Sequence, residues 1–390
     1  YKRQIYLLPF GGGEAQRLTD LKGSIGSMSW SPDGARLLLQ FREKSAETLE
    51  REEDEAKKKL GIVARRITRV DFRSDGAGFL PDERWHIWTV EVDGGEAKQL
   101  TSTEYDEFSP CWSPDGKRIA FVSNRSEQPD LTPELDDVFV MTLEDGEPQR
   151  LPTHEGGKTA LRFSPDGTHL SYVGRKGIGN WWRHSRLWIV ASDGSEESRD
   201  LTDSSIHVSN STIGDVADRP LTAPFWSPDS DTIYFQASHH GNTELKCVDL
   251  QGKVQSVLNE DGVYSNISLS QDGKMLAYLW GNFVEPGQLW CSDIDGDNKQ
   301  RLTEVNRDWL DEVELGEVET VWITGQEGND LQGWILRPPG FDPSQKYPSI
   351  LEIHGGPWLQ YGHIFMHEFY ALAAQGYVVH FCNPRGGHGY

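Results

Sequence analysis

The chain has 390 residues, and its 61 aspartates and glutamates outnumber its 38 lysines and arginines, which gives a formal net charge of −23. This excess of negative charge disfavours nucleic acid and anionic membranes as partners. The sequence has no run of about 18 apolar residues, so it predicts no transmembrane helix. The opening stretch is too short and too mixed for a signal peptide. Four widely spaced cysteines are interpreted as buried, reduced thiols of a cytoplasmic protein: Cys111, Cys247, Cys291 and Cys382.

A two-part repeat fills residues 4–303. Its first part is an aromatic residue, a Ser-Pro-Asp-Gly motif and an apolar strand. Its second part is a strand, an Asp-Gly or Gly-Gly turn and another strand. Asp and Gly tolerate the positive φ that tight hairpin turns need. Both parts together supply four strands per unit of about fifty residues, which is typical of a β-propeller blade. The motif starts, in weakening copies, at Trp30, Trp112, Phe163, Trp226 and Leu269.

The first copy is incomplete, because Gln4 to Thr19 forms a second part with no first part before it. Residue 1 therefore falls inside a blade, and we expect native sequence to precede it. The number of blades in the complete ring is open between six and eight, with seven as the expectation.

Two excursions interrupt the repeat. Residues 42–84 open with the charge-dense run Glu43 to Lys59, which predicts a solvated helix or a flexible arm, with a lid or subunit contact as the alternative. Residues 203–220 form the second excursion, to which the sequence assigns no role. Between two strands of one blade, Trp181 to His184 could contact a peptide or pack against a neighbouring blade, and packing is the preferred interpretation.

Two metal-like patterns are set aside. Asp293 to Asn298 superficially resembles a calcium loop, but its glycine is misplaced and the stretch is also a turn of the repeat. His363 and His367 are four apart in a predicted helix, yet the order of Glu and His is not that of a zinc protease and no third ligand is evident. No metal or cofactor is predicted.

After Thr303 the repeat stops, and residues 306–317 are acidic and linker-like. Residues 318–324 and 331–336 predict a hairpin, and residues 350–353 a buried strand. Residues 363–375 then predict a helix, and residues 377–382 an apolar strand. This order begins an α/β domain. We therefore predict a mainly β chain with a propeller over residues 1–317 and a truncated α/β domain over residues 318–390.

The loop after the strand at 350–353 is the candidate site. It reads His354-Gly355-Gly356-Pro357, and consecutive glycines let backbone N–H groups approach a ligand. A His-Gly-Gly loop at a strand end is one way in which α/β-hydrolases build half of an oxyanion hole. We interpret His354 as shaping this loop through hydrogen bonds, in preference to acting as a general base.

The combination of motifs resembles the prolyl oligopeptidase family of serine peptidases. It comprises the propeller repeats, Trp334 to Pro339, Ile353 to Trp358, and Asn383 to Gly386 with Gly389-Tyr390. The inserted segment Thr68 to Leu80 is similar to the acylaminoacyl-peptidase and dipeptidyl-peptidase-like branch.

The resemblance implies a propeller that caps an α/β-hydrolase domain and admits only short peptides to a Ser-Asp-His triad. Gly356 matches the glycine whose backbone N–H donates to the oxyanion. No Gly-x-Ser-x-Gly motif occurs in these residues, so we expect the triad beyond Tyr390 and the present chain alone to be inactive. The alternatives are a non-catalytic propeller that binds a peptide or protein, or an esterase of the same fold. A homo-oligomer paired through edge strands is also open.

Overall fold

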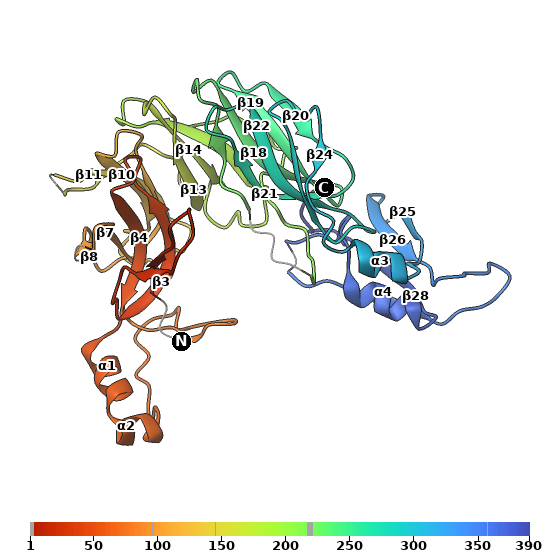
Figure 1. The fold of residues 1–390 in the computed structure, drawn as a ribbon, viewed down its shortest axis with the longest axis horizontal. Helices are drawn as coiled ribbons and strands as arrows, with labels where there is room; N and C mark the ends of the chain where they lie inside the picture. The colour runs from red at the N-terminus through yellow and green to blue at the C-terminus, as the bar shows by residue number, and fades with distance from the viewer. Residues whose placement is uncertain (1–3, 95–96, 145, 217–220, 357) are drawn as a thin grey trace. The chain divides into compact units, whose positions relative to one another are not determined.

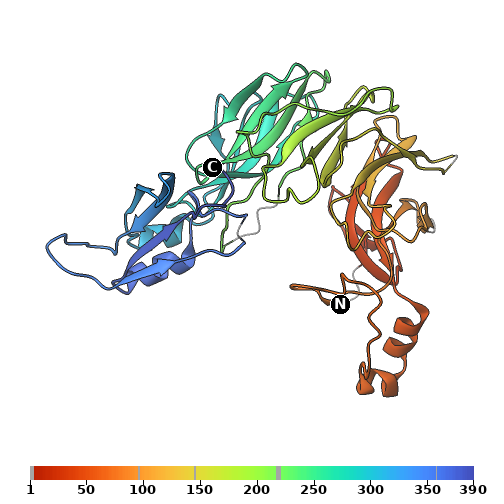
Figure 2. The ribbon, with the colours of Figure 1, turned by 180° about the vertical axis from the view of Figure 1, so that it is seen from behind.

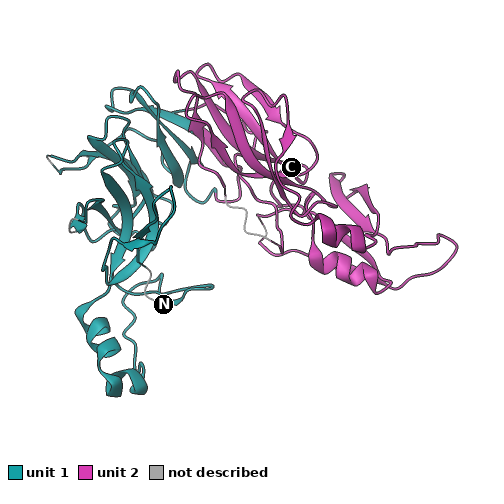
Figure 3. Cartoon of the chain, in the orientation of Figure 1, with its two compact units in different colours: residues 1–180, 188–199 teal, residues 181–187, 200–390 magenta. Residues whose placement is uncertain are grey.

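The computed structural model describes residues 4–94, 97–144, 146–216, 221–356 and 358–390 (Figure 1). The chain divides into two compact units (Figure 3), here called unit 1 (residues 1–180 and 188–199) and unit 2 (residues 181–187 and 200–390). These units differ from the predicted domains, 1–317 and 318–390, which rest on the end of the repeat and stay a prediction. Each unit is described by itself.

Unit 1 contains antiparallel four-stranded sheets with the strand order expected of propeller blades. A two-stranded hairpin precedes them, as the incomplete first copy predicts. The hairpin is β1 (Tyr6–Leu7) and β2 (Gln16–Arg17); the blades are β3 (Gly23–Trp30), β4 (Arg36–Glu43), β7 (His86–Glu91) and β8 (Ala97–Gln99), then β9 (Glu107–Trp112), β10 (Arg118–Ser123), β11 (Asp137–Thr142) and β12 (Gln149–Arg150), then β13 (Lys158–Phe163), β14 (His169–Gly174), β15 (Arg186–Ala191) and β16 (Arg199–Asp200).

The Ser-Pro-Asp-Gly motif recurs because it closes the turn between the first two strands of a blade. In the second blade the Ser113 hydroxyl donates to the Asp115 carboxylate at 2.5 Å and accepts from the Arg118 N–H at 2.9 Å. Gly116 takes φ +66°, and its N–H donates to the Ser113 carbonyl. The Ser113 hydrogen bond also holds the pKa of Asp115 below its usual value. All of these contacts are local, so each copy of the motif specifies its own turn.

The first excursion contains α1 (Ala46–Glu53) and α2 (Glu55–Leu60), neither of which buries a residue. Asp54 ends α1 and caps α2, since its carboxylate accepts from the N–H groups of Ala56 and Lys57. The short hairpin of β5 (Arg73–Ser74) and β6 (Gly78–Phe79) follows. Of the two predicted forms, solvated helix and flexible arm, the structure shows exposed helix, and the alternative role as a lid or subunit contact stays a prediction.

Unit 2 contains two further blades within one eight-stranded sheet (Figure 2), joined by the parallel pairing of Thr243 with Val263. The turn from Asp293 to Asn298 connects two of their strands and is therefore the expected turn of the repeat. The strands are β17 (Phe225–Trp226), β18 (Thr232–His239), β19 (Asn242–Asp249), β20 (Val254–Leu258), β21 (Val263–Leu269), β22 (Met275–Gly281), β23 (Gln288–Asp293) and β24 (Gln300–Arg301).

The end of the chain forms a separate sheet of order β25-β26-β28-β27, in which β27 and β28 are parallel. A core of aromatic side chains, including Trp334, Phe369 and Phe381, lies between this sheet and its helix. The residues expected to be only a linker include the short helix α3. The elements are α3 (Arg307–Glu312), β25 (Val318–Thr324), β26 (Asp330–Leu336), β27 (Ser349–Glu352), α4 (His367–Ala374) and β28 (Val378–Cys382).

Two expectations for this region are wrong. The strand at 350–353 is not buried, because β27 is the edge strand of its sheet and leaves Leu351 60% exposed and Ile353 73% exposed. The helix begins at His367 and not at His363, because the carboxylate of Asp215 accepts from the N–H groups of His367 (3.0 Å) and Glu368 (2.8 Å) and caps it there.

The four cysteines are free thiols, as predicted, but only Cys111 is buried, since the other three are partly exposed. Burial raises the pKa of Cys111 to about 12. Over the described parts of the chain, no helix is long and apolar enough to cross a membrane.

Candidate active site

The candidate loop lies where two parallel strands end. Leu351 and Glu352 of β27 pair with His380 and Phe381 of β28, so the loops that follow both strands leave the same edge of the sheet. Residues 353–356 follow β27, and residues 383–390 follow β28. In open α/β sheets, this carboxyl edge is where ligands bind.

Gly356 is a position that requires glycine. Its φ is +131°, and a Cβ added there would lie 3.0 Å from the backbone nitrogen of Trp358. A Cβ on Gly355, in contrast, would meet no atom within 4 Å. Gly356 is also exposed to solvent. The loop thus keeps a bare backbone at Gly356, as an oxyanion donor needs, and the catalytic role of its N–H stays a prediction. Pro357, the next residue of the motif, lies outside the described residues.

His354 is held by oxygen atoms on both sides of its ring. Nδ1 lies 2.8 Å from the carbonyl oxygen of Gly355, and Nε2 lies 3.2 Å from Oδ1 of Asn383. The ring also meets Tyr361 edge-on, with 4.9 Å between centroids. These contacts connect the loop after β27 to the residue that follows β28, which supports the interpretation of His354 as a loop-shaping residue.

Asn383 is the centre of the hydrogen bonds at this edge. The side chain is 2% exposed. Its Oδ1 accepts from the Tyr361 N–H at 2.7 Å, while its Nδ2 donates to the Tyr361 carbonyl at 2.8 Å and to the Tyr390 hydroxyl at 2.5 Å. The Tyr390 hydroxyl donates onward to Gln332, and burial raises the pKa of Tyr390. The sequence singled out Asn383 only as part of a motif and missed this role.

Within unit 2, the turn of the propeller repeat at Gly241 packs against Gln360 and Gly362, which follow the candidate loop. The amide of Gln360, which is fully buried, accepts from the Gly241 N–H at 3.2 Å and donates to the Asn242 carbonyl at 3.1 Å. Gly362 allows the close approach, because a Cβ there would lie 2.0 Å from the Gly241 carbonyl oxygen. The backbone of Gln360 also pairs with residues 211–213 of the second excursion. That excursion therefore supports the loop.

The two histidines considered for zinc are not on one helix face. His363 precedes α4, and its Nδ1 lies 2.5 Å from Oδ1 of Asn242 in the core. Burial lowers the pKa of His363, and the nearby charge of Asp261 opposes this effect. His367 is exposed at the start of α4. Within the described ranges, no three or more His, Cys, Asp or Glu side chains are grouped to hold a metal ion.

Trp181 contacts the candidate loop directly. Its ring centroid lies 4.1 Å from that of Trp358, at an interplanar angle of 57°. The neighbouring Trp182 is 55% exposed, and the Arg183 guanidinium lies 5.0 Å from its ring centroid. Neither of the two expectations for residues 181–184 anticipated this contact, since Trp358 belongs to the loop and not to a blade.

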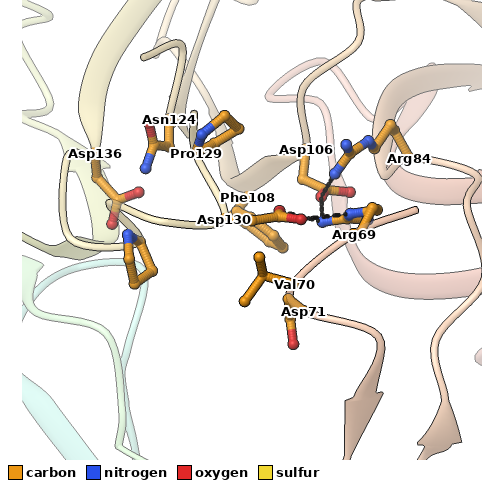
Figure 4. Close-up of a pocket in the computed structure, with 11 residues that line it drawn as sticks. Arg69, Val70, Asp71, Arg84, Asp106, Phe108, Asn124, Pro129, Asp130 and Asp136 are labelled. Atoms are coloured by element: carbon orange, nitrogen blue, oxygen red, sulfur yellow. Dashed lines mark hydrogen bonds and ion pairs between the residues drawn. The ribbon is translucent and has the colours of Figure 1, made fainter. Parts of the chain in front are cut away.

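Unit 1 has a separate cavity of about 480 Å³ beside the first excursion (Figure 4). Arg69 donates to both carboxylate oxygens of Asp130, at 2.9 and 3.1 Å, and Arg84 donates to Asp106 at 3.0 Å. Burial raises the pKa of Asp136, across the cavity, to about 6. Arg69 belongs to the segment Thr68 to Leu80, so its ion pair with Asp130 fastens that segment to the rest of unit 1.

The family model of the TolB beta propeller domain matches residues 84–308, more than half of the chain. The chain belongs to this propeller family. The uncharacterized peptidase YuxL of Bacillus subtilis is 30% identical over 99% of this chain and 58% of its own length. Dipeptidyl-peptidase 5 of Porphyromonas gingivalis is 28% identical over 77% of this chain and 42% of its own length.

A solved structure extends the similarity to the fold of nearly the whole chain. The acylaminoacyl peptidase of Pyrococcus horikoshii superposes with a TM-score of 0.74 and 20% identity, over 99% of this chain and 55% of that one. The predicted fold class, a propeller leading into an α/β segment, is confirmed. The peptidase names of the similar proteins agree with the predicted resemblance to the prolyl oligopeptidase family. The chain spans about half the length of these peptidases, between 42% and 58%.

Proposed function

We propose that this chain is the propeller and the first part of the catalytic domain of a serine peptidase that hydrolyses short peptides. Residues 1–317 would form the propeller part, and residues 318–390 the start of an α/β-hydrolase domain. The Ser-Asp-His triad would lie beyond residue 390. The observation that carries the proposal is Gly356, an exposed glycine of positive φ at the carboxyl edge of two parallel strands. The peptidase names of the relatives support it.

In this proposal the Gly356 N–H donates to the oxygen that becomes negative when the serine attacks the peptide carbonyl. A single preorganised donor of this kind stabilises the transition state by roughly 3–4 kcal/mol. The propeller acts as a size filter, in keeping with the dipeptidyl and acylaminoacyl names of similar proteins. We place the protein in the cytoplasm, where its four free thiols stay reduced.

The test compares two glycine variants of the full-length protein. Gly356→Ala puts a side chain at φ +131° and is expected to lower kcat by about 10²–10³-fold, the effect of losing one oxyanion donor. Gly340→Ala is the matched control, because Gly340 also has a positive φ (+67°), has open space around it and lies outside the loop. Equal activity of the two variants would contradict the assignment of Gly356.

A second measurement tests the proposal that the Ser-Asp-His triad lies beyond residue 390. A serine-directed fluorophosphonate is expected to label the full-length protein and to leave a protein of residues 1–390 unlabelled. Labelling of the shorter protein would show that its nucleophile lies within these residues. A full-length protein that is neither labelled nor active on peptides or esters would favour the non-catalytic binding propeller.

A further inference from the structure

The backbone around Gly356 has little intrinsic rigidity, so neighbouring contacts must hold it in place. Gly355 and Gly356 follow each other, and glycine restricts the backbone less than any other residue. An oxyanion donor, however, must be placed to a fraction of an ångström, since an error of about 1 Å can cost about 10²-fold in rate. The contacts on both sides of the glycine pair therefore matter for catalysis.

On the amino-terminal side, the anchor is the His354 ring against Asn383. On the carboxyl-terminal side, Trp358 is two residues beyond Gly356, and its ring lies against Trp181 at 4.1 Å between centroids. A single residue separates Trp358 from Gly356 in the chain, so a shift of Trp358 would also move the backbone of Gly356.

We propose that Trp181 is a positioning residue for the oxyanion donor, which rests on the peptidase function proposed above. Trp181 lies between β14 and β15, in the propeller repeat, and is not part of the α/β segment. Its indole packs on Trp358 and restrains the loop after the glycine pair, whereas the His354 contact restrains it before the pair. A segment of the propeller thus takes part in setting the catalytic geometry.

Trp182, the next residue after Trp181 in the connection between β14 and β15, offers a matched control. It has the same side chain, and its exposure is similar, 55% against 44% for Trp181. Its ring lies beside the Arg183 guanidinium, and Trp358 contacts the ring of Trp181. Replacing Trp182 therefore removes an exposed indole of the propeller and leaves the Trp181–Trp358 pair in place.

The experiment measures kcat and KM of the full-length protein on a short peptide. Trp181→Ala is expected to lower kcat about 10-fold with KM changed less than about 2-fold, because the donor acts on the transition state more than on bound substrate. Trp181→Phe, which keeps an aromatic ring, is expected to recover kcat to within about 3-fold of wild type. Trp182→Ala is expected to match wild type. A loss confined to KM, or equal losses in both alanine variants, would overturn the proposal.

A readout other than activity separates this proposal from the proposed function. Two indoles in contact give a coupled signal in the far-ultraviolet circular dichroism, and difference spectra separate this pair from the other tryptophans, such as Trp280 beside Trp290. Trp181→Phe and Trp358→Phe should each remove the same component, which Trp182→Phe should keep. If neither variant removes that signal but wild type hydrolyses peptides, the positioning role is wrong and the peptidase function stands. If the signal is present but no peptide is hydrolysed, the peptidase function is wrong, and the positioning role fails with it.

Discussion

Replacing Asn383 with alanine should destabilise unit 2 strongly. The side chain satisfies the N–H and the carbonyl of Tyr361 together, and Tyr361 is itself only 6% exposed. Alanine offers neither a donor nor an acceptor, so both backbone groups would be left buried without their partner. The hydrogen bond to His354, which anchors the candidate loop, would be lost at the same time.

The magnitude follows from those two backbone groups. Leaving a buried donor or acceptor unsatisfied costs about 1–3 kcal/mol, so two such groups cost about 2–6 kcal/mol. We therefore expect a loss of about 3 kcal/mol in the free energy of unfolding.

Urea unfolding followed by tryptophan fluorescence measures this loss, because Trp334 in the adjacent core is 1% exposed and reports on unfolding there. Asn329→Ala is the control, since Asn329 is exposed in the turn between β25 and β26 of the same sheet. Its effect should stay within about 0.5 kcal/mol. If Asn383→Ala were no more destabilising than Asn329→Ala, the hydrogen bonds of Asn383 would not hold this edge together.

Three further changes have defined outcomes. Asp215→Ala removes the cap of α4 and should cost about 1 kcal/mol in the same urea assay, whereas an unchanged midpoint would contradict the capping role. Arg69→Ala breaks the two hydrogen bonds to Asp130 and should speed chymotrypsin cleavage within residues 61–84; an unchanged rate would argue against that anchor. Folding raises the pKa of Asp136 to about 6, so the unfolded state loses this proton first, and the stability that Asp136 contributes is lost as pH rises from about 4 to 6. Carboxylates of lowered pKa, such as Asp130, act in the opposite sense, so the effect is measured as a difference between two proteins. Asp136→Asn should lose less stability than wild type over this range, and parallel pH profiles of stability for the two proteins would refute the effect.

The sequence predicted the features that depend on neighbouring residues. Each Ser-Pro-Asp-Gly turn is closed by hydrogen bonds within a few residues, as at Ser113, so the repeat pattern alone was enough to place the blade strands. The charge-dense run from Glu43 to Lys59 was expected to form a solvated helix or a flexible arm, and it forms exposed helices. Gly356 was found in the same way, because a positive φ and a nearby backbone leave a local signal, namely glycine.

The features that the sequence did not predict depend on residues far apart in the chain. Asp215 caps a helix that begins about 150 residues later, and Gln360 contacts a turn that precedes it by about 120 residues. A single carboxylate or amide leaves no periodic pattern at such a separation. The sequence placed the start of α4 too early for a similar reason. Phe365 fits the helical spacing and is buried, but it lies in an irregular segment before the helix.

The contacts between the propeller repeat and the candidate loop suggest two roles for the propeller, as a substrate filter and as a support of the loop. Within unit 2, Trp181 contacts Trp358, and the turn at Gly241 holds Gln360, so segments of the repeat fix the loop on its carboxyl-terminal side. A filter and a support predict different effects of Trp181→Ala. A change in filtering would alter kcat/KM for long peptides and leave that for the shortest peptides intact. A displaced oxyanion donor would lower kcat by the same factor for every peptide length, because each substrate forms the same oxyanion.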